Sequence, residues 1–316
     1  MTYYGSLVWL LLHSFLSIHA HTDFCSVLPA NQVGSVSGAY VVCTSLENPD
    51  FFTNTSIESS SVLAFAFVGA VYYDYKEQIV YTLVANQSAP CGTPWFWFLA
   101  INLETRVIDR HSPINNSWLP ASDIAYDSVK KQFFYMAQEN GQGGSPSIIV
   151  IDRDTFVPEI LWSFPTGLWC AVPTAFIWHS RKRQLHFLAY QEGPNYFESQ
   201  FVTLDVDNKM WQAIVVPCSD PQNRPLQLWL DPGTDSFYSI VGYSNDFISH
   251  PTPMYLAHFN ESSGLSVRVP NAPNFTLPDY LFAYYDPAYD TLSRIVYLFT
   301  NYSWGPIRQP WRQAFP

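Results

Sequence analysis

The sequence is poor in charged residues and in glycine. Asp, Glu, Lys and Arg together make up 13% of its 316 residues, and only 14 residues are glycine. A disordered chain has many charges and few aromatic residues, whereas 17% of this chain is Phe, Trp or Tyr. The net charge of −11 argues against a nucleic acid or an anionic membrane as partner, because both attract basic surfaces. The composition therefore predicts a folded protein that binds neither.

The chain also lacks the short motifs that mark common catalytic and metal sites. It contains no G-x-S-x-G, no H-E-x-x-H and no phosphate-binding loop. None of its five cysteines belongs to a C-x-x-C or Cys/His cluster with the spacing of a zinc site. We therefore expect no metal and no cofactor.

Residues 1–20 have the features of a secretory signal peptide. An apolar stretch from Leu7 to Ile18 is followed by the small residue Ala20, after which the chain becomes polar. A buried N-terminal strand or an uncleaved anchor is the alternative. No other apolar run reaches the roughly 18–20 residues that a spanning helix needs. We expect cleavage after Ala20, a tail over residues 21–35, and secretion to the extracellular space.

Sites for N-linked glycosylation support secretion. The sequence has six N-x-[ST] sequons, against about 2.4 expected by chance from its numbers of Asn, Ser and Thr. A glycan is bulky and solvating, so each site must lie at the surface. The predicted glycosylation sites are Asn54, Asn86, Asn115, Asn260, Asn274 and Asn301.

A repeated pair of hairpins runs through most of the chain. The first hairpin of each repeat has an apolar strand, a polar turn and an apolar-aromatic strand. Its turn opens at Asp74, Asp127, His179, Asp231 and Asp286, with spacings of 53, 52, 52 and 55 residues. A second hairpin follows each of the first four, at residues 97–110, 147–162, 200–216 and 254–269. Four short strands in each period of this length are typical of a propeller blade.

This pattern resembles that of β-propeller repeat proteins in general, over roughly residues 65–300. The resemblance implies an all-β chain with a single β-propeller over residues 36–316. The five repeats, which begin near residues 65, 120, 173, 225 and 279, predict five four-stranded blades.

The fifth repeat lacks a second hairpin, and residues 36–57 have the form of one. We expect this N-terminal hairpin to complete the last blade and close the ring, which leaves no sheet edge unpaired across the join. A sixth blade is the alternative if a partner or a longer C-terminus supplies strands.

The long loops on one face of the predicted ring carry the candidate ligand-binding residues. Nine of the 15 basic residues lie in the short turns of the other face, whereas the long loops are acidic. An acidic face attracts cations or neutral polyols, although solvated turns collect charge in any fold. The predicted glycans leave one sector of this face open, where aromatic side chains suit sugars or protein partners, unless they only cap the core. The candidates are Asp123, Trp169, Glu192, Tyr196, Asp220 and Gln227.

Two carboxylates near the predicted axis are the candidates for catalysis. Asp123 and Asp279 lie at or just before the start of an innermost strand. Five-bladed glycosidases place their acid and base carboxylates near this axis, but here a third carboxylate is missing. The aspartates that open the hairpin turns have a local explanation, because such side chains accept hydrogen bonds from the backbone of their own turn.

The sequence therefore predicts a secreted, glycosylated β-propeller that binds a carbohydrate or an extracellular protein through its acidic long-loop face. We expect a monomer and a binding protein rather than an enzyme. A glycosidase-like or lactonase-like propeller hydrolase that uses Asp123 and Asp279 is the alternative.

The cysteines are expected to form disulfides in an oxidising compartment. We predict Cys25–Cys91 and Cys170–Cys218, because the members of each pair lie on the same face of neighbouring blades. Cys43, in an apolar strand, is expected to stay free. Cys25–Cys43 is the alternative pairing.

Overall fold

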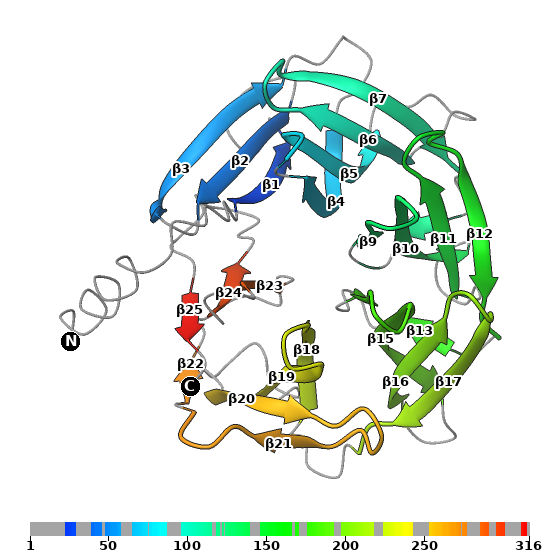
Figure 1. Cartoon of the computed structure of the whole chain (residues 1–316), viewed down its shortest axis with the longest axis vertical. Helices are drawn as coiled ribbons and strands as arrows, with labels where there is room; N and C mark the ends of the chain where they lie inside the picture. Colours follow the sequence, from blue (N-terminus) through cyan, green and yellow to red (C-terminus); the bar gives the residue numbers. More distant parts are fainter. Residues whose placement is uncertain are drawn as a thin grey trace.

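The protein is an all-β ring of antiparallel sheets (Figure 1), which confirms the predicted propeller fold. In the residues that it describes, the computed structural model contains six sheets and no helix. Accordingly, these residues include no helix that is long and apolar enough to cross a membrane. The described residues are 23–29, 39–45, 48–57, 65–74, 76–86, 96–115, 118–120, 122, 124–139, 146–165, 168–170, 176–192, 197–217, 224–242, 253–272, 274–276, 285–290, 295–300 and 311–314.

Each of the first four repeats forms one sheet, whose strands follow one another outward from the axis (Figure 1). The first repeat consists of β4 (Phe65–Asp74), β5 (Ile79–Asn86), β6 (Phe96–Asn102) and β7 (Val107–Ile114). The fourth repeat consists of β18 (Arg224–Asp231), β19 (Ser236–Gly242), β20 (Pro253–Phe259) and β21 (Ser266–Arg268), and β22 (Phe275–Thr276) also pairs with β20.

In the second and third repeats the innermost strand is divided in two. β8 (Trp118–Pro120) and β9 (Ala125–Asp127) both pair with β10 (Gln132–Glu139), which is followed by β11 (Pro146–Asp152) and β12 (Pro158–Ser163). β13 (Leu168–Cys170) and β14 (Phe176–His179) both pair with β15 (Gln184–Glu192), which is followed by β16 (Phe197–Asp205) and β17 (Met210–Val215).

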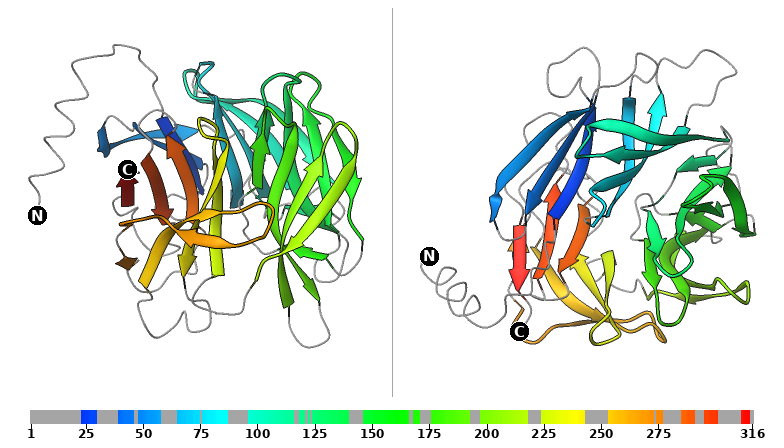
Figure 2. Two further views of the ribbon diagram at one scale, coloured as in Figure 1. Left: turned by 60° about the horizontal axis from the view of Figure 1, so that its bottom comes forward. Right: turned by 45° about the horizontal axis from the view of Figure 1, so that its top comes forward.

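The two ends of the chain form separate sheets, which corrects the predicted closure by residues 36–57. The hairpin of β2 (Ala39–Ser45) and β3 (Asn48–Ile57) pairs with β1 (Asp23–Pro29), a strand within the predicted tail. β23 (Tyr285–Asp290) and β24 (Ile295–Thr300) pair with β25 (Trp311–Ala314). The two sheets lie side by side in Figures 1 and 2. The last repeat therefore takes its third strand from residues after 300, which the repeat pattern does not mark.

The first sheet also places two cysteines opposite one another. Cys25 on β1 and Cys43 on β2 are direct partners in the antiparallel register. Cys43 is disulfide-bonded, so the expectation of a free thiol there is wrong. The register fits the alternative pairing Cys25–Cys43, because directly opposed residues lie within the reach of a disulfide. Cys91, Cys218 and the side chain of Cys170 lie outside the described residues.

Eight hairpin turns share one geometry that the sequence encodes. Asp152 Oδ1, for example, accepts hydrogen bonds from the backbone N–H groups of Asp154 and Thr155 at 2.9 and 2.8 Å. The same kind of bond is accepted by Asp74, Asn102, Asp127, His179, Asp205, Asp231 and Asn260. The fourth residue after each acceptor has a positive φ, between 54° and 71°. The structural role predicted for Asp74, Asp127, Asp152, His179, Asp205 and Asp231 is therefore confirmed, and Asn102 and Asn260 play the same role.

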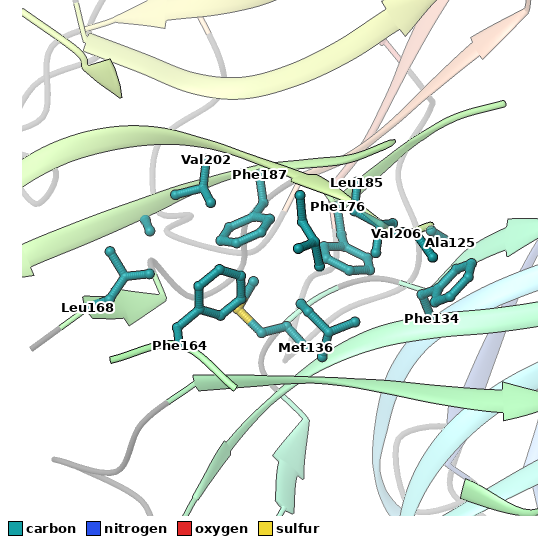
Figure 3. Packing of buried hydrophobic residues seen from close by; sticks show 13 residues of the cluster. Ala125, Phe134, Met136, Phe164, Leu168, Phe176, Leu185, Phe187, Val202 and Val206 are labelled. Atoms are coloured by element: carbon teal, nitrogen blue, oxygen red, sulfur yellow. The ribbon is translucent and has the colours of Figure 1, made fainter. Parts of the chain in front are cut away.

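The core lies between neighbouring sheets. In Figure 3, Phe134 and Met136 of the second repeat pack in one cluster with Phe176 and Phe187 of the third repeat. Similar clusters of buried residues join the first repeat to the second, the third to the fourth, and the N-terminal sheet to the first repeat. Burial of this kind contributes about 25 cal/mol per Å² of apolar surface, so it holds the innermost strands in place relative to one another.

Candidate binding site between two innermost strands

A pocket of about 260 Å³ opens between the innermost strands of the third and fourth repeats. It is formed by β14, β18 and the hairpin turns that follow them, so it lies at the short-turn end of the ring. The two largest apolar side chains in its lining are Trp178 and Trp229. Its polar and charged side chains are His179, Ser180, Arg181 and Asp235. An apolar pocket with a few convergent polar groups is the usual form of a small-molecule site.

Packing against neighbouring aromatic rings fixes both indoles. Trp178 stacks on Phe134 of the second repeat, with ring centroids 5.3 Å apart. Trp229 is 4% exposed and stacks on Tyr238, with ring centroids 6.1 Å apart. A rigid aromatic wall loses little conformational entropy when a ligand packs against it. The apolar side of the pocket is therefore preformed.

A His–Asp pair crosses the pocket from one repeat to the next. His179 Nε2 and Asp235 Oδ1 lie 2.7 Å apart, although not in hydrogen-bond geometry. Burial lowers the pKa of His179, against the opposing effect of the Asp235 carboxylate. Because the ordinary pKa of histidine is already about 6.5, this imidazole is neutral at pH 7. The Asp235 carboxylate also lies 3.7 Å from Lys182 Nζ.

The pair occupies positions that hold an acid and a base in the preceding interface. Asp127 opens the turn of the second repeat and pairs with Arg183, the positive-φ residue of the third. His179 opens the turn of the third repeat and pairs with Asp235, the positive-φ residue of the fourth. The acidic and the basic residue have thus exchanged positions between the two interfaces. This reversal leaves a carboxylate, rather than a guanidinium, in the pocket.

Three consecutive basic residues occupy the turn after β14. Arg183 pairs with Asp127 and Asp207, and Lys182 pairs with carboxylates of the fourth repeat. Arg181 lines the pocket. In the part of the chain that the structure describes, no carboxylate lies within ion-pair distance of Arg181. Among the described residues, Arg181 therefore differs from its two neighbours in forming no ion pair with a carboxylate.

Carboxylates neutralise much of the positive charge predicted for the short-turn face. Arg153, for example, lies 3.4 Å from Asp74 of the first repeat. Other bases of this face that form ion pairs are Lys130, Lys131, Lys182 and Arg183. A ligand at this end of the ring therefore meets a local arrangement of charges rather than one positive surface.

The predicted long-loop site is not tested by the described residues. Trp169, Glu192 and Gln227 belong to β13, β15 and β18, but their side chains lie outside the described part of the structure. Asp123, Tyr196, Asp220 and Asp279 lie outside it entirely. None of these seven is among the described residues that line the pocket. The long-loop site and the two candidate catalytic carboxylates stay predictions.

Three of the predicted glycosylation sites are exposed in the structure, as a glycan requires. These are Asn115, Asn260 and Asn274. The side chains of Asn54, Asn86 and Asn301 lie outside the described residues. Glycosylation itself stays a prediction.

Sequence reasoning missed the pocket because it interpreted His179 as a turn residue only. The sequence does carry a signal at this position. The third repeat opens its turn with His where the others have Asp, and the following repeat has an acid at the positive-φ position. Two such departures in neighbouring repeats indicate a local site. Within the described residues, no group of His, Cys, Asp or Glu side chains is arranged to hold a metal ion.

A second histidine of the third repeat makes stability depend on pH. His186 is 1% exposed, its Nδ1 lies 3.0 Å from Thr203 Oγ1, and burial lowers its pKa to about 3. In the unfolded chain its pKa is about 6.5, so between pH 6.5 and pH 3 the unfolded state binds more protons. Acid therefore favours unfolding in that range, and the stability that the neutral imidazole contributes is fully present only above pH 6.5.

Lowering the pH from 6.5 to 4.5 reduces the free energy of unfolding of the wild type. We expect this reduction to be about 2 kcal/mol smaller in His186→Leu. Denaturant unfolding at the two pH values measures this difference. The control is His258→Leu, which changes an exposed histidine on β20. Equal losses in the wild type and in His186→Leu would show that His186 does not set the pH dependence.

Comparisons with known proteins give fold-level similarity only. No family model and no curated protein sequence matches the chain. An oligogalacturonate lyase in complex with manganese is similar over 88% of this chain and 83% of its own, with a TM-score of 0.47 and 8% identity. An oligogalacturonate lyase from Vibrio parahaemolyticus is similar over 83% of this chain and 80% of its own, with a TM-score of 0.43 and 8% identity. A hypothetical selenium-binding protein from Sulfolobus tokodaii is similar over 76% of this chain and 64% of its own, with a TM-score of 0.44 and 11% identity.

Proposed function

We propose that this protein is a secreted, glycosylated propeller that binds a carbohydrate in the pocket between β14 and β18. The observation that carries the proposal is the combination of two fixed indoles, Trp178 and Trp229, with the polar side chains of the same lining. A sugar ring has apolar C–H faces that pack on aromatic rings and hydroxyl groups at its edge that need hydrogen-bond partners. The predicted signal peptide and the six sequons support an extracellular setting.

Binding is favoured over hydrolysis because the described lining contains a single carboxylate. Hydrolysis of a glycosidic bond ordinarily needs two, one as acid and one as base or nucleophile. Asp235 is the only acid among the described lining residues. It is held between His179 and Lys182. We therefore expect a bound sugar to be released unchanged.

Titration calorimetry of the secreted protein with a panel of monosaccharides and disaccharides tests the proposal. We expect saturable binding of at least one sugar with a dissociation constant near the millimolar range, as is usual for so small an interface. Trp178→Phe keeps an aromatic ring at the site but removes part of its area, so we expect severalfold weaker binding.

The matched control is Trp162→Phe, on the outermost strand β12 of the second repeat. This variant makes the same chemical change away from the pocket, and we expect its affinity to equal that of the wild type. Absence of binding by every sugar in the panel, or equal affinities for Trp178→Phe and the wild type, would contradict the proposed site.

A further inference from the structure

We infer that the sugar carries a carboxylate, and that Arg181 is the residue that binds it. This inference rests on the proposed function and names the class of ligand for the same pocket. It follows from the distribution of charge in the turn after β14, from the acid that faces this turn, and from the chemistry of the guanidinium group.

The turn after β14 carries three basic residues, and one of them, Arg181, differs from the other two in its ion pairs. The side chains of Lys182 and Arg183 are 36% and 22% exposed, and each is compensated by two carboxylates. Arg181 is exposed, lines the pocket, and has no carboxylate within ion-pair distance among the described residues. A guanidinium in the lining of a preformed pocket is a site for an anion that the protein does not itself supply.

The geometry of the guanidinium group favours a carboxylate as that anion. Its planar fork of N–H donors matches the two oxygens of a carboxylate, and such pairs form two parallel charge-assisted hydrogen bonds. Arg181, Trp178 and Trp229 line the same pocket, so we expect a sugar acid whose carboxylate binds Arg181 to place its ring near the indoles. A neutral sugar can pack on the indoles but cannot form an ion pair with Arg181.

The neighbouring Asp235 limits the charge of the ligand and selects for hydroxyl groups. Its carboxylate lies in the same lining, and its side chain is 37% exposed. A doubly charged phosphate would be repelled by this acid and by the net charge of −11. A hydroxyl group, in contrast, can donate a hydrogen bond to the carboxylate. One negative charge and several hydroxyl groups on one ring describe a sugar carboxylate.

The test compares D-glucuronate, D-glucose and benzoate by titration calorimetry at low ionic strength. We expect D-glucuronate to bind about tenfold more tightly than D-glucose. Arg181→Gln is expected to abolish this preference, so that the two sugars bind with similar affinities. The matched control is Arg106→Gln, which removes the same charge from a turn of the first repeat outside the pocket. We expect it to bind both sugars as the wild type does.

Each other outcome overturns a defined part of the argument. Equal affinities for the two sugars, or no change in Arg181→Gln, would overturn the carboxylate site and leave the proposed carbohydrate function standing. Binding of neither sugar would overturn the proposed function and the inference with it. Benzoate that binds as tightly as D-glucuronate through Arg181 would overturn the assignment to sugars, because the site would then recognise any ring that carries a carboxylate.

Discussion

Arg183→Met is expected to lower the free energy of unfolding by about 3 kcal/mol or more. Arg183 Nη1 donates to Asp127 Oδ2 at 2.9 Å, and the side chain of Asp127 is 1% exposed. Removing the guanidinium leaves a buried carboxylate without its counter-charge, which is the costly way to break a buried pair. Methionine preserves most of the apolar stem, so little packing is lost. Denaturant unfolding measures the change.

Two further variants separate charge from packing at Arg183. Asp127→Asn combined with Arg183→Met removes both charges and keeps Oδ1, which accepts from the backbone N–H of Val129 at 2.9 Å. We expect the double variant to be clearly more stable than Arg183→Met alone. Arg181→Met, in the same turn, is expected to change stability by less than about 0.5 kcal/mol. Equal stabilities of the single and double variants at position 183 would contradict the role of the buried charge.

Phe133→Ala is expected to lower the free energy of unfolding by about 3–5 kcal/mol. Phe133 is fully buried on β10 and packs on Tyr81 and Phe98 of the first repeat, at 4.4 and 5.2 Å between ring centroids. Truncation creates a cavity between two blades. Because this packing holds the first and second repeats together, we expect the loss in a single cooperative transition rather than in a separate early phase.

Two matched controls test this explanation, one with a smaller cavity at the same site and one at an exposed site. Phe133→Leu fills part of the space and should cost less than half as much as alanine. Val129→Ala, at a turn residue that is 78% exposed in the same repeat, should have almost no effect. A loss below about 1 kcal/mol for Phe133→Ala would show that the contact between these blades contributes little to the stability of the ring.

The repeats and their turns could be predicted because their causes are local. Short runs of apolar and aromatic residues mark the strands, and a side-chain acceptor at the start of each turn marks each hairpin. Asp152 and Asp205 show this directly, since each accepts bonds from the backbone of its own turn. The four-stranded order of the first repeat, β4 to β7, follows from the same pattern.

Pairing of the chain ends could not be predicted from the repeat, because its cause is not local. β1 and β25 are short strands outside the repeated pattern, and each has several possible partners until the ring forms. The pocket has the same origin. His179 and Asp235 each belong to an ordinary turn, and only the packing of the third repeat on the fourth brings them 2.7 Å apart. Contacts between side chains of different blades therefore cannot be predicted from the local sequence and are seen only in the structure.

The measurement that tests the binding site most directly is the nitrogen–proton NMR spectrum of the indoles during titration with D-glucuronate. The resonances of Trp178, Trp229 and Trp162 are assigned from their Phe variants. A sugar ring that packs in the pocket changes the surroundings of Trp178 and Trp229, which line it, and not those of Trp162 on β12. We expect saturable shifts of the first two resonances and none of the third. A spectrum in which neither Trp178 nor Trp229 shifts at saturating sugar would contradict binding between β14 and β18.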